Sequence, residues 1–140
     1  MQTPILAPAA VLIIWSLVML IWMAAVRMPA LARAGIRIEE RKGGRGQDLE
    51  GVLAPEVNWK AHNYAHLMEQ PTLFYACVLI LALVGYSSAV FIAAWLYVGL
   101  RIVHSLWQAQ VNTVPVRLVL FMLSSFTLMF MAINALIAAI

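Results

Sequence analysis

Four long apolar segments run along the chain, at residues 5–26, 61–85, 89–107 and 116–140, with polar residues between them. Each approaches the ~20 residues that an α-helix needs to cross the ~30 Å hydrocarbon core of a bilayer. The apolar runs are continuous and do not alternate with polar residues, which favours helices over the strands of a membrane barrel. The pattern therefore predicts an all-α protein, an integral membrane four-helix bundle in which residues 1–140 form a single domain.

The composition agrees with this interpretation, because 64% of the 140 residues are hydrophobic and only 11% are charged. A soluble domain of this length does not need so much apolar material for its core. The chain has one cysteine, so no disulfide can form within it.

Basic side chains are concentrated in the connection at residues 27–60, between the first two predicted helices. Seven of the nine Lys and Arg residues lie there: Arg27, Arg33, Arg37, Arg41, Lys42, Arg45 and Lys60. By the positive-inside rule, this connection is cytoplasmic and both termini lie on the outer side of the cell's inner membrane. Topology and attraction to anionic membrane lipids explain the formal charge of +3, which therefore indicates no nucleic acid partner.

The second predicted helix carries polar residues where it enters the membrane. His62, His66 and Glu69 fall within about 60° of one another on a helix, and so share one face. Pro71 removes a backbone hydrogen bond and predicts a kink beside Glu69. A carboxylate at this depth costs free energy unless a partner neutralises it, so we expect Glu69 to be paired.

The third predicted helix supplies a matching polar stripe near the same membrane face. Within an arc of about 100° lie six polar side chains: Tyr97, Arg101, His104, Ser105, Gln108 and Asn112. The residues between them are mostly apolar, which makes the stripe one-sided. Arg101 is the candidate partner for Glu69, and the sequence predicts an ion pair between them.

The link QVNTVPVR opens the fourth predicted helix and puts Arg117 in its first turn. An arginine at this position opposes the helix macrodipole, so helix stability does not explain it. Free backbone N–H groups next to a guanidinium favour an anion site. A contact with lipid phosphate is the alternative for an isolated arginine, but the two polar stripes nearby favour the anion site.

Three short motifs, EQPTLFY, RIVHSLWQ and VPVR, resemble those of the MAPEG family, the membrane-associated proteins of eicosanoid and glutathione metabolism. In EQPTLFY, Glu69, Pro71 and Phe74 fit the family's second-helix motif. The resemblance covers nearly the whole chain and is to the bacterial-type members. It implies a homotrimer of four-helix bundles, with sites between subunits that face the cytoplasm.

The resemblance also implies a function. In RIVHSLWQ, Arg101, His104 and Ser105 match the third-helix motif, and Arg117 falls on the arginine that stabilises the glutathione thiolate in family enzymes. The implied activity is that of a membrane-embedded transferase or peroxidase, which uses glutathione or another small thiol against lipophilic electrophiles. Arg117 is then the catalytic residue. The side chains expected to bind the co-substrate glutathione are Lys60, His62, His66, Glu69, Arg101, His104, Ser105 and Gln108.

Two other interpretations of the polar residues stay open. His62, His66 and Glu69, with His104 opposite, have a spacing that suits zinc or iron, although the basic side chains nearby disfavour a cation and we expect no metal. The same Glu–Arg–His network also suits a small proton-coupled transporter or a non-catalytic membrane scaffold.

Overall fold

The computed structural model describes residues 3–140, and five α-helices within them make up four membrane-length spans. The helices are α1 (Leu6–Arg33), α2 (Pro55–Leu67), α3 (Pro71–Val84), α4 (Ser88–Gln110) and α5 (Val114–Ala139). Two short 3₁₀ turns, Ile38–Glu40 and Gly46–Leu49, lie in the connection between α1 and α2. The described residues contain no strand, so the predicted all-α fold is confirmed.

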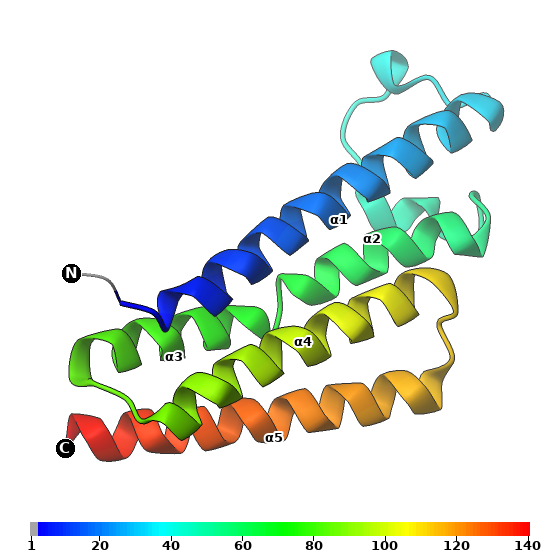
Figure 1. Cartoon of the computed structure of the whole chain (residues 1–140). Coiled ribbons are helices and arrows are strands. Elements are labelled where there is room, and N and C mark those ends of the chain that lie inside the picture. The colour runs from blue at the N-terminus through cyan, green and yellow to red at the C-terminus, as the bar shows by residue number, and fades with distance from the viewer. Residues whose placement is uncertain (1–2) are drawn as a thin grey trace.

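The spans lie side by side in one bundle (Figure 1). α2 and α3 follow each other along a single span, and α4 packs against α1, α2 and α5. α1 begins and α5 ends at one end of the bundle, whereas the α1–α2 connection and the α4–α5 turn lie at the other end (Figure 1). Each span is long and apolar enough to cross a membrane, as expected for a multi-pass membrane protein.

Two helices extend further into the basic connection than their hydropathy predicts. α1 continues to Arg33, with Pro29 inside it, and α2 already begins at Pro55. The expected connection at residues 27–60 is therefore shortened to residues 34–54. The reason is that hydropathy marks where the apolar environment ends, whereas Ala, Leu, Met and Arg continue a helix into a polar environment.

The second span breaks where the sequence predicts a kink. α2 ends at Leu67 and α3 begins with Pro71, so residues 68–70 form the break beside Glu69. Proline lacks the N–H that would bond to the carbonyl of Leu67, and it fits the first turn of a new helix. The expected kink is confirmed, and it divides the span into two helices.

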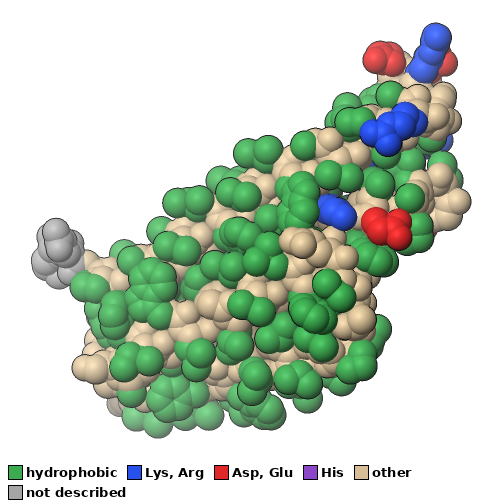
Figure 2. Space-filling view, turned by 45° about the vertical axis from the view of Figure 1, so that its right-hand side comes forward, with side chains coloured by type: hydrophobic (Ala, Val, Ile, Leu, Met, Phe, Trp, Pro, Cys, Tyr) green, Lys and Arg blue, Asp and Glu red, His purple; other side chains and the backbone are tan. Residues whose placement is uncertain are grey.

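Apolar side chains cover the outside of the bundle as well as its core (Figure 2). The core between the helices includes Leu12, Phe74, Val98 and Met131. Large apolar side chains such as Leu83 also lie on the outer surface. Charged side chains gather at one end in the view of Figure 2, which is the end of the α1–α2 connection. This distribution fits a bundle surrounded by lipid, with one charged end in the headgroup region.

The α1–α2 connection packs against the ends of its two helices. Asn58 of α2 donates a hydrogen bond from Nδ2 to the carbonyl of Leu49 (3.1 Å), and Arg27 of α1 donates from Nη2 to the carbonyl of Gly46 (3.0 Å). Leu31, Leu49 and Leu53 form a second small core beneath it. The connection is thus fixed to the ends of α1 and α2.

Candidate functional site

The polar stripe of α4 faces the inside of the bundle. Five of its six members are buried: Tyr97, Arg101, His104, Ser105 and Gln108. Val103 and Leu106 on the other side of the helix are exposed to the surroundings. The predicted one-sided stripe is therefore confirmed, and α4 brings a line of polar groups into an otherwise apolar bundle.

Arg101 lies at the centre of this line and is 0% exposed. Its Nη2 donates to Nδ1 of His66 (3.2 Å) and to the backbone carbonyl of His66 (3.1 Å). Because a guanidinium has only donors, Nδ1 must accept, and a neutral His66 ring carries its hydrogen on Nε2. Nε and Nη1 of Arg101 are buried without a partner in the described part of the chain.

The predicted ion pair between Glu69 and Arg101 is wrong. The Glu69 side chain is 68% exposed, and the basic group near its carboxylate is His66, with Nε2 and Oε2 4.0 Å apart. The prediction assumed a continuous helix, but Glu69 lies in the break at residues 68–70, where its exposed carboxylate is close to His66 and makes no ion pair with Arg101. Within residues 3–140, no carboxylate forms an ion pair with Arg101.

A cavity of about 250 Å³ lies beside this arginine–histidine pair. It is lined by His66, His104, Val114, Arg117, Leu118 and Phe121, and we call it the polar cavity. The rings of His66 and His104 stack with their centroids 4.9 Å apart, and Phe121 lies 5.6 Å from His66. Helices α2, α4 and α5 each contribute to its wall.

The turn between α4 and α5 positions Arg117 at this cavity. Asn112 stops α4 with a φ of 59°, a left-handed conformation that asparagine tolerates better than most residues. Its Oδ1 then accepts a hydrogen bond from Nη1 of Arg117 (2.7 Å). α5 begins at Val114 with a proline in its first turn, so Arg117 lies near the free N–H groups of a helix start.

Three of the other predicted binding residues, Ser105, Gln108 and Lys60, lie outside the polar cavity. Ser105 accepts a hydrogen bond from Trp15 of α1 (3.0 Å), and Gln108 is buried with an Oε1 that has no partner among residues 3–140. Lys60 donates to the carbonyl of Glu56 and lies over the ring of Trp22, 5.7 Å from its centroid. None of these three side chains lines the polar cavity.

His62 also lies away from the polar cavity. It contacts Glu50 of the α1–α2 connection through Nε2, and both side chains are about half exposed. The structure thus brings together His66, His104 and Arg117, with Arg101 behind them, and leaves Lys60 and His62 at the charged end.

Sequence reasoning missed Asn63 and Phe121. Asn63 is buried on α2, and neither its Oδ1 nor its Nδ2 has a partner in the described chain. It precedes His66 by one helical turn, so helical spacing was a signal for it. Phe121 follows Arg117 by one turn and could have been found in the same way.

Among residues 3–140, no three or more His, Cys, Asp or Glu side chains are grouped in a way that could hold a metal ion. The set considered from the sequence does not come together, because His62 contacts Glu50 and Glu69 is exposed. Besides the exposed Glu69, 4.0 Å from His66, the charged groups beside the two histidines are the guanidinium groups of Arg101 and Arg117, and these positive charges disfavour a cation.

A sequence model of the MAPEG family matches residues 5–137, which is almost the whole chain. The chain belongs to the MAPEG family. No curated protein and no solved structure matches it at a significant level. The family membership inferred from the three short motifs is therefore confirmed by a match that reaches into all four spans.

The MAPEG motif residues have different structural roles in this chain. Pro71 begins α3, and the buried Phe74 stacks on Tyr97 with ring centroids 4.4 Å apart, so Pro71 starts the helix and Phe74 packs α3 against α4. Arg101 holds His66, as described above. His104 and Arg117 line the polar cavity, where chemistry on a ligand can occur.

Proposed function

We propose that this MAPEG protein is a membrane-embedded transferase or peroxidase that uses glutathione, or another small thiol, against lipophilic electrophiles. One observation carries the proposal: the Arg117 side chain lines a cavity that also contains two histidines and contains no carboxylate among its lining residues. A cationic group without an acidic partner, next to the start of a helix, favours an anion.

Arg117 acts in this proposal by stabilising a thiolate. A thiol with a pKa of ~8.5 is mostly protonated at neutral pH, and a guanidinium beside it lowers that pKa. In conjugation with an activated alkene, the C–S bond forms, the C=C π bond breaks, and the thiol proton ends on the neighbouring carbon. In peroxide reduction, two thiols become one disulfide while the peroxide becomes an alcohol and water.

Unpartnered polar groups on α2, α4 and α5 support a peptide-like thiol. Within the described residues, Nε of Arg117, which lines the polar cavity, and Nε and Nη1 of Arg101 are buried donors without a partner, and Asn63 and Gln108 add further unpartnered atoms. Buried polar groups cost free energy unless they are hydrogen-bonded. A ligand with carboxylate and amide groups, such as glutathione, supplies suitable partners.

We also propose a homotrimer with the α1–α2 connection in the cytoplasm. The MAPEG membership supports oligomerisation, and the basic residues of the connection support its orientation. The mass of the protein in detergent, measured with the bound detergent subtracted, is expected to be that of three chains. A monomer at low protein concentration would contradict the assembly.

The function is tested by titrating the purified protein in detergent with glutathione. We expect thiolate absorbance to rise and the melting temperature to increase with glutathione, since a ligand that binds only the folded state stabilises it. S-methyl glutathione is the control, because it keeps the peptide but cannot form a thiolate. If neither signal responds to glutathione or to other small thiols, the proposal is wrong.

One observation favours a second candidate, a proton-coupled transporter. The Glu69 side chain is 68% exposed, lies 4.0 Å from Nε2 of His66 and makes no ion pair with Arg101 in the described chain, so a carboxylate is accessible at the break in the second span. The test is proton uptake by proteoliposomes under a pH gradient, with Glu69→Gln as the control. Substrate-coupled uptake by the wild type that Glu69→Gln abolishes would favour the transporter over the enzyme.

A further inference from the structure

The ring of His66 has one nitrogen that the bundle uses and one that it does not. Nδ1 accepts a hydrogen bond from Nη2 of Arg101 (3.2 Å), which leaves the hydrogen of the neutral ring on Nε2. The same guanidinium nitrogen donates to the backbone carbonyl of His66 (3.1 Å), so the arginine holds both the ring and the backbone that carries it. Arg101 thereby makes Nε2 of the neutral ring a hydrogen-bond donor of fixed position.

This Nε2 has no hydrogen-bond partner among residues 3–140. A carboxylate oxygen, Oε2 of Glu69, lies 4.0 Å from it, which is beyond hydrogen-bonding distance, and the Glu69 side chain is 68% exposed. The His66 side chain is 21% exposed, and its ring forms part of the wall of the polar cavity. A ligand in this cavity therefore meets a donor that the described chain does not use.

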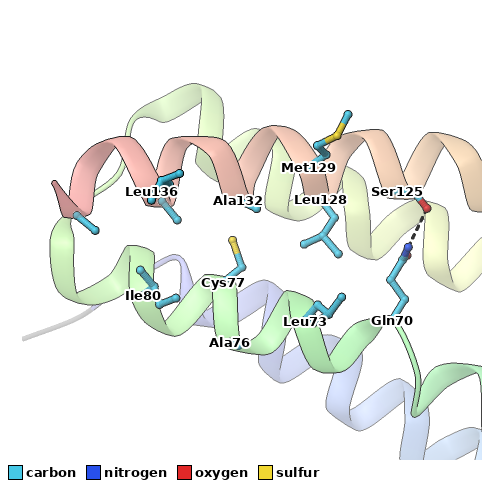
Figure 3. Close-up of a pocket in the computed structure, with 12 residues that line it drawn as sticks. Gln70, Leu73, Ala76, Cys77, Ile80, Ser125, Leu128, Met129, Ala132 and Leu136 are labelled. Atoms are coloured by element: carbon cyan, nitrogen blue, oxygen red, sulfur yellow. Dashed lines mark hydrogen bonds between the residues drawn. The ribbon is translucent and has the colours of Figure 1, made fainter.

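Polar groups at the larger cleft between α3 and α5 are treated differently (Figure 3). This cleft, of about 600 Å³, is lined mainly by apolar side chains, with Gln70 and Ser125 at one end. Nε2 of Gln70 donates to Oγ of Ser125 (2.7 Å), as Figure 3 shows, and its Oε1 accepts from the hydroxyl of Tyr97 (3.3 Å). Oγ of Ser125 donates in turn to the carbonyl of Phe121 (2.7 Å). These polar groups bind one another, so an unused donor such as that of His66 is not a general feature of the bundle.

His104 is the other ring of the polar cavity, and no partner fixes the position of its hydrogen. It stacks on His66 with the ring centroids 4.9 Å apart and an angle of 23° between the planes. Within residues 3–140, the histidine rings that form hydrogen bonds are those of His62 and His66. The stack thus supports the His66 ring, while Arg101 decides which of its nitrogens carries the hydrogen.

We propose that His66 is a second catalytic residue, whose Nε2–H donates a hydrogen bond to the carbonyl oxygen of the electrophile. This inference rests on the proposed function and names a chemical class for its substrate, the α,β-unsaturated carbonyl compounds. Arg101 is the positioning residue of the His66 ring. Arg117 and His66 then act on different reactants, because Arg117 stabilises the thiolate and His66 stabilises the oxygen of the electrophile.

The donor acts at the step in which negative charge reaches oxygen. The thiol loses its proton to solvent beside Arg117, and the sulfur then bonds to the β-carbon while the C=C π electrons move to form an enolate. The Nε2–H of His66 keeps its proton and stabilises the enolate oxygen by a hydrogen bond. A proton from solvent ends on the α-carbon and restores the carbonyl, so the product contains all atoms of thiol and enone. A donor that is already in place where charge develops lowers the barrier to such a step.

The first test compares two electrophiles at a saturating concentration of glutathione. Benzylideneacetone develops charge on a carbonyl oxygen, whereas benzyl chloride releases chloride and contains no oxygen. His66→Asn keeps an oxygen near the position of Nδ1 for Arg101 but has no donor at the position of Nε2. We expect the ratio of kcat/KM for the enone to kcat/KM for the chloride to fall on the order of a hundredfold, as for the loss of one oxyanion donor. Damage to the thiol site lowers both rates alike and cancels in this ratio.

His66→Gln is the matched control, because the glutamine nitrogen can replace Nε2 as the donor while no acceptor stays at the position of Nδ1. It should restore most of the ratio. His104→Asn makes the same change on the ring whose hydrogen no partner fixes, and it should keep the wild-type ratio. The inference is overturned if His66→Asn keeps that ratio or exceeds His66→Gln, since His66 would then serve only as an acceptor for Arg101. A ratio lowered by His104→Asn and not by His66→Asn would also overturn it.

The second test needs neither thiol nor turnover. Benzylideneacetone with an isotope-labelled carbonyl is added to the purified protein, and its C=O stretch is isolated by subtracting the infrared spectrum with the unlabelled compound. We expect a band at lower frequency than in empty detergent micelles for the wild type and for His66→Gln, because a hydrogen bond weakens the C=O bond. His66→Asn should lose this shift. A wild-type band at the frequency found in micelles would contradict the inference.

The two tests distinguish this inference from the proposed function. If the wild type converts neither electrophile but shows a shifted carbonyl band that His66→Asn loses, the proposed function fails and the carbonyl donor stands. If the wild type conjugates both electrophiles but neither the ratio nor the band responds to His66→Asn, the proposed function stands and His66 is not the donor.

Discussion

The middle of α4 and the start of α5 each bring an arginine to the same part of the bundle, but the two arginines are held differently. Arg101 is 0% exposed and donates twice to His66, to the ring and to the backbone carbonyl. Arg117 is half-buried, lines the polar cavity and, within the described part of the chain, makes a single side-chain hydrogen bond, to Asn112 of the adjoining turn.

This difference indicates different roles for the same side chain. Arg101 connects α4 to the end of α2 and fixes the hydrogen position on a neutral His66 ring, so its shown contacts are structural ones. Among residues 3–140, the one hydrogen bond of the Arg117 side chain is to its own turn, and Arg117 lines a cavity. Substitutions at these two positions should therefore affect different measurements, and the four predictions below separate stability from activity.

The largest effect is expected for Arg101→Ala. The substitution leaves a cavity in the packed interior and removes the donor for two acceptors of His66. Large-to-small core substitutions of this kind cost about 3 kcal/mol or more. We expect a strongly lowered melting temperature in detergent, followed by tryptophan fluorescence, and loss of any measurable activity as a consequence.

Arg101→Met is the control for this prediction. Methionine fills most of the volume and brings no charge, so it should recover a large part of the lost stability. An Arg101→Ala protein that melts like the wild type would show that Arg101 does not connect α4 to α2.

The next effect concerns Arg117→Ala and should appear in activity alone. Loss of one charged contact to a developing anion costs on the order of a hundredfold in rate. We expect the rate of conjugation with a generic aromatic electrophile to fall by this factor and the apparent pKa of the bound thiol to rise. The melting temperature should be almost unchanged. A first-turn arginine contributes little to its own helix, since it opposes the macrodipole.

Arg117→Lys should restore part of the activity, because lysine keeps the charge but lacks the fork geometry of the guanidinium. If the wild type binds thiol and the Arg117→Ala protein reacts equally fast, Arg117 does not activate the thiol. His104, which lines the same cavity, is then the next candidate.

Most of the fold could be predicted from the sequence, because lipid imposes a simple requirement on each span. About 20 continuous apolar residues are needed, and the four spans meet that requirement. Hydropathy did not predict the ends of α1 and α2, since it reports the environment of a segment and not its backbone hydrogen bonds. The family membership could be predicted because its motifs keep their order along the chain.

The site could be predicted only where helical periodicity holds without interruption. α4 is one unbroken helix, and its polar stripe is buried as predicted. Pro71 predicted the break in the second span, but not the direction in which Glu69 turns within it. Sequence spacing also could not reveal that the α1–α2 connection folds back to contact His62.

A smaller effect is expected for His66→Leu. The substitution removes the ring acceptor for Arg101 but keeps the backbone carbonyl, so one hydrogen bond of about 1 kcal/mol is lost. His66→Asn should recover part of the loss, because its side-chain oxygen can accept from the same guanidinium. Melting temperatures that fall equally for both substitutions would show that packing against His104, and not the hydrogen bond, explains the effect.

The smallest effect is expected for Glu69→Gln, and it tests the corrected position of this residue. An exposed carboxylate without a partner at Arg101 contributes little, so the stability should stay within about 0.5 kcal/mol of the wild type. Combined with Arg101→Met, the two changes should be additive, because side chains that do not interact show no coupling energy. A large loss in Glu69→Gln that Arg101→Met relieves would mean that the two charges meet in the membrane after all. The break at residues 68–70 would then have to bring the carboxylate back to α4, and the polar cavity would contain a fixed ion pair in place of an anion site.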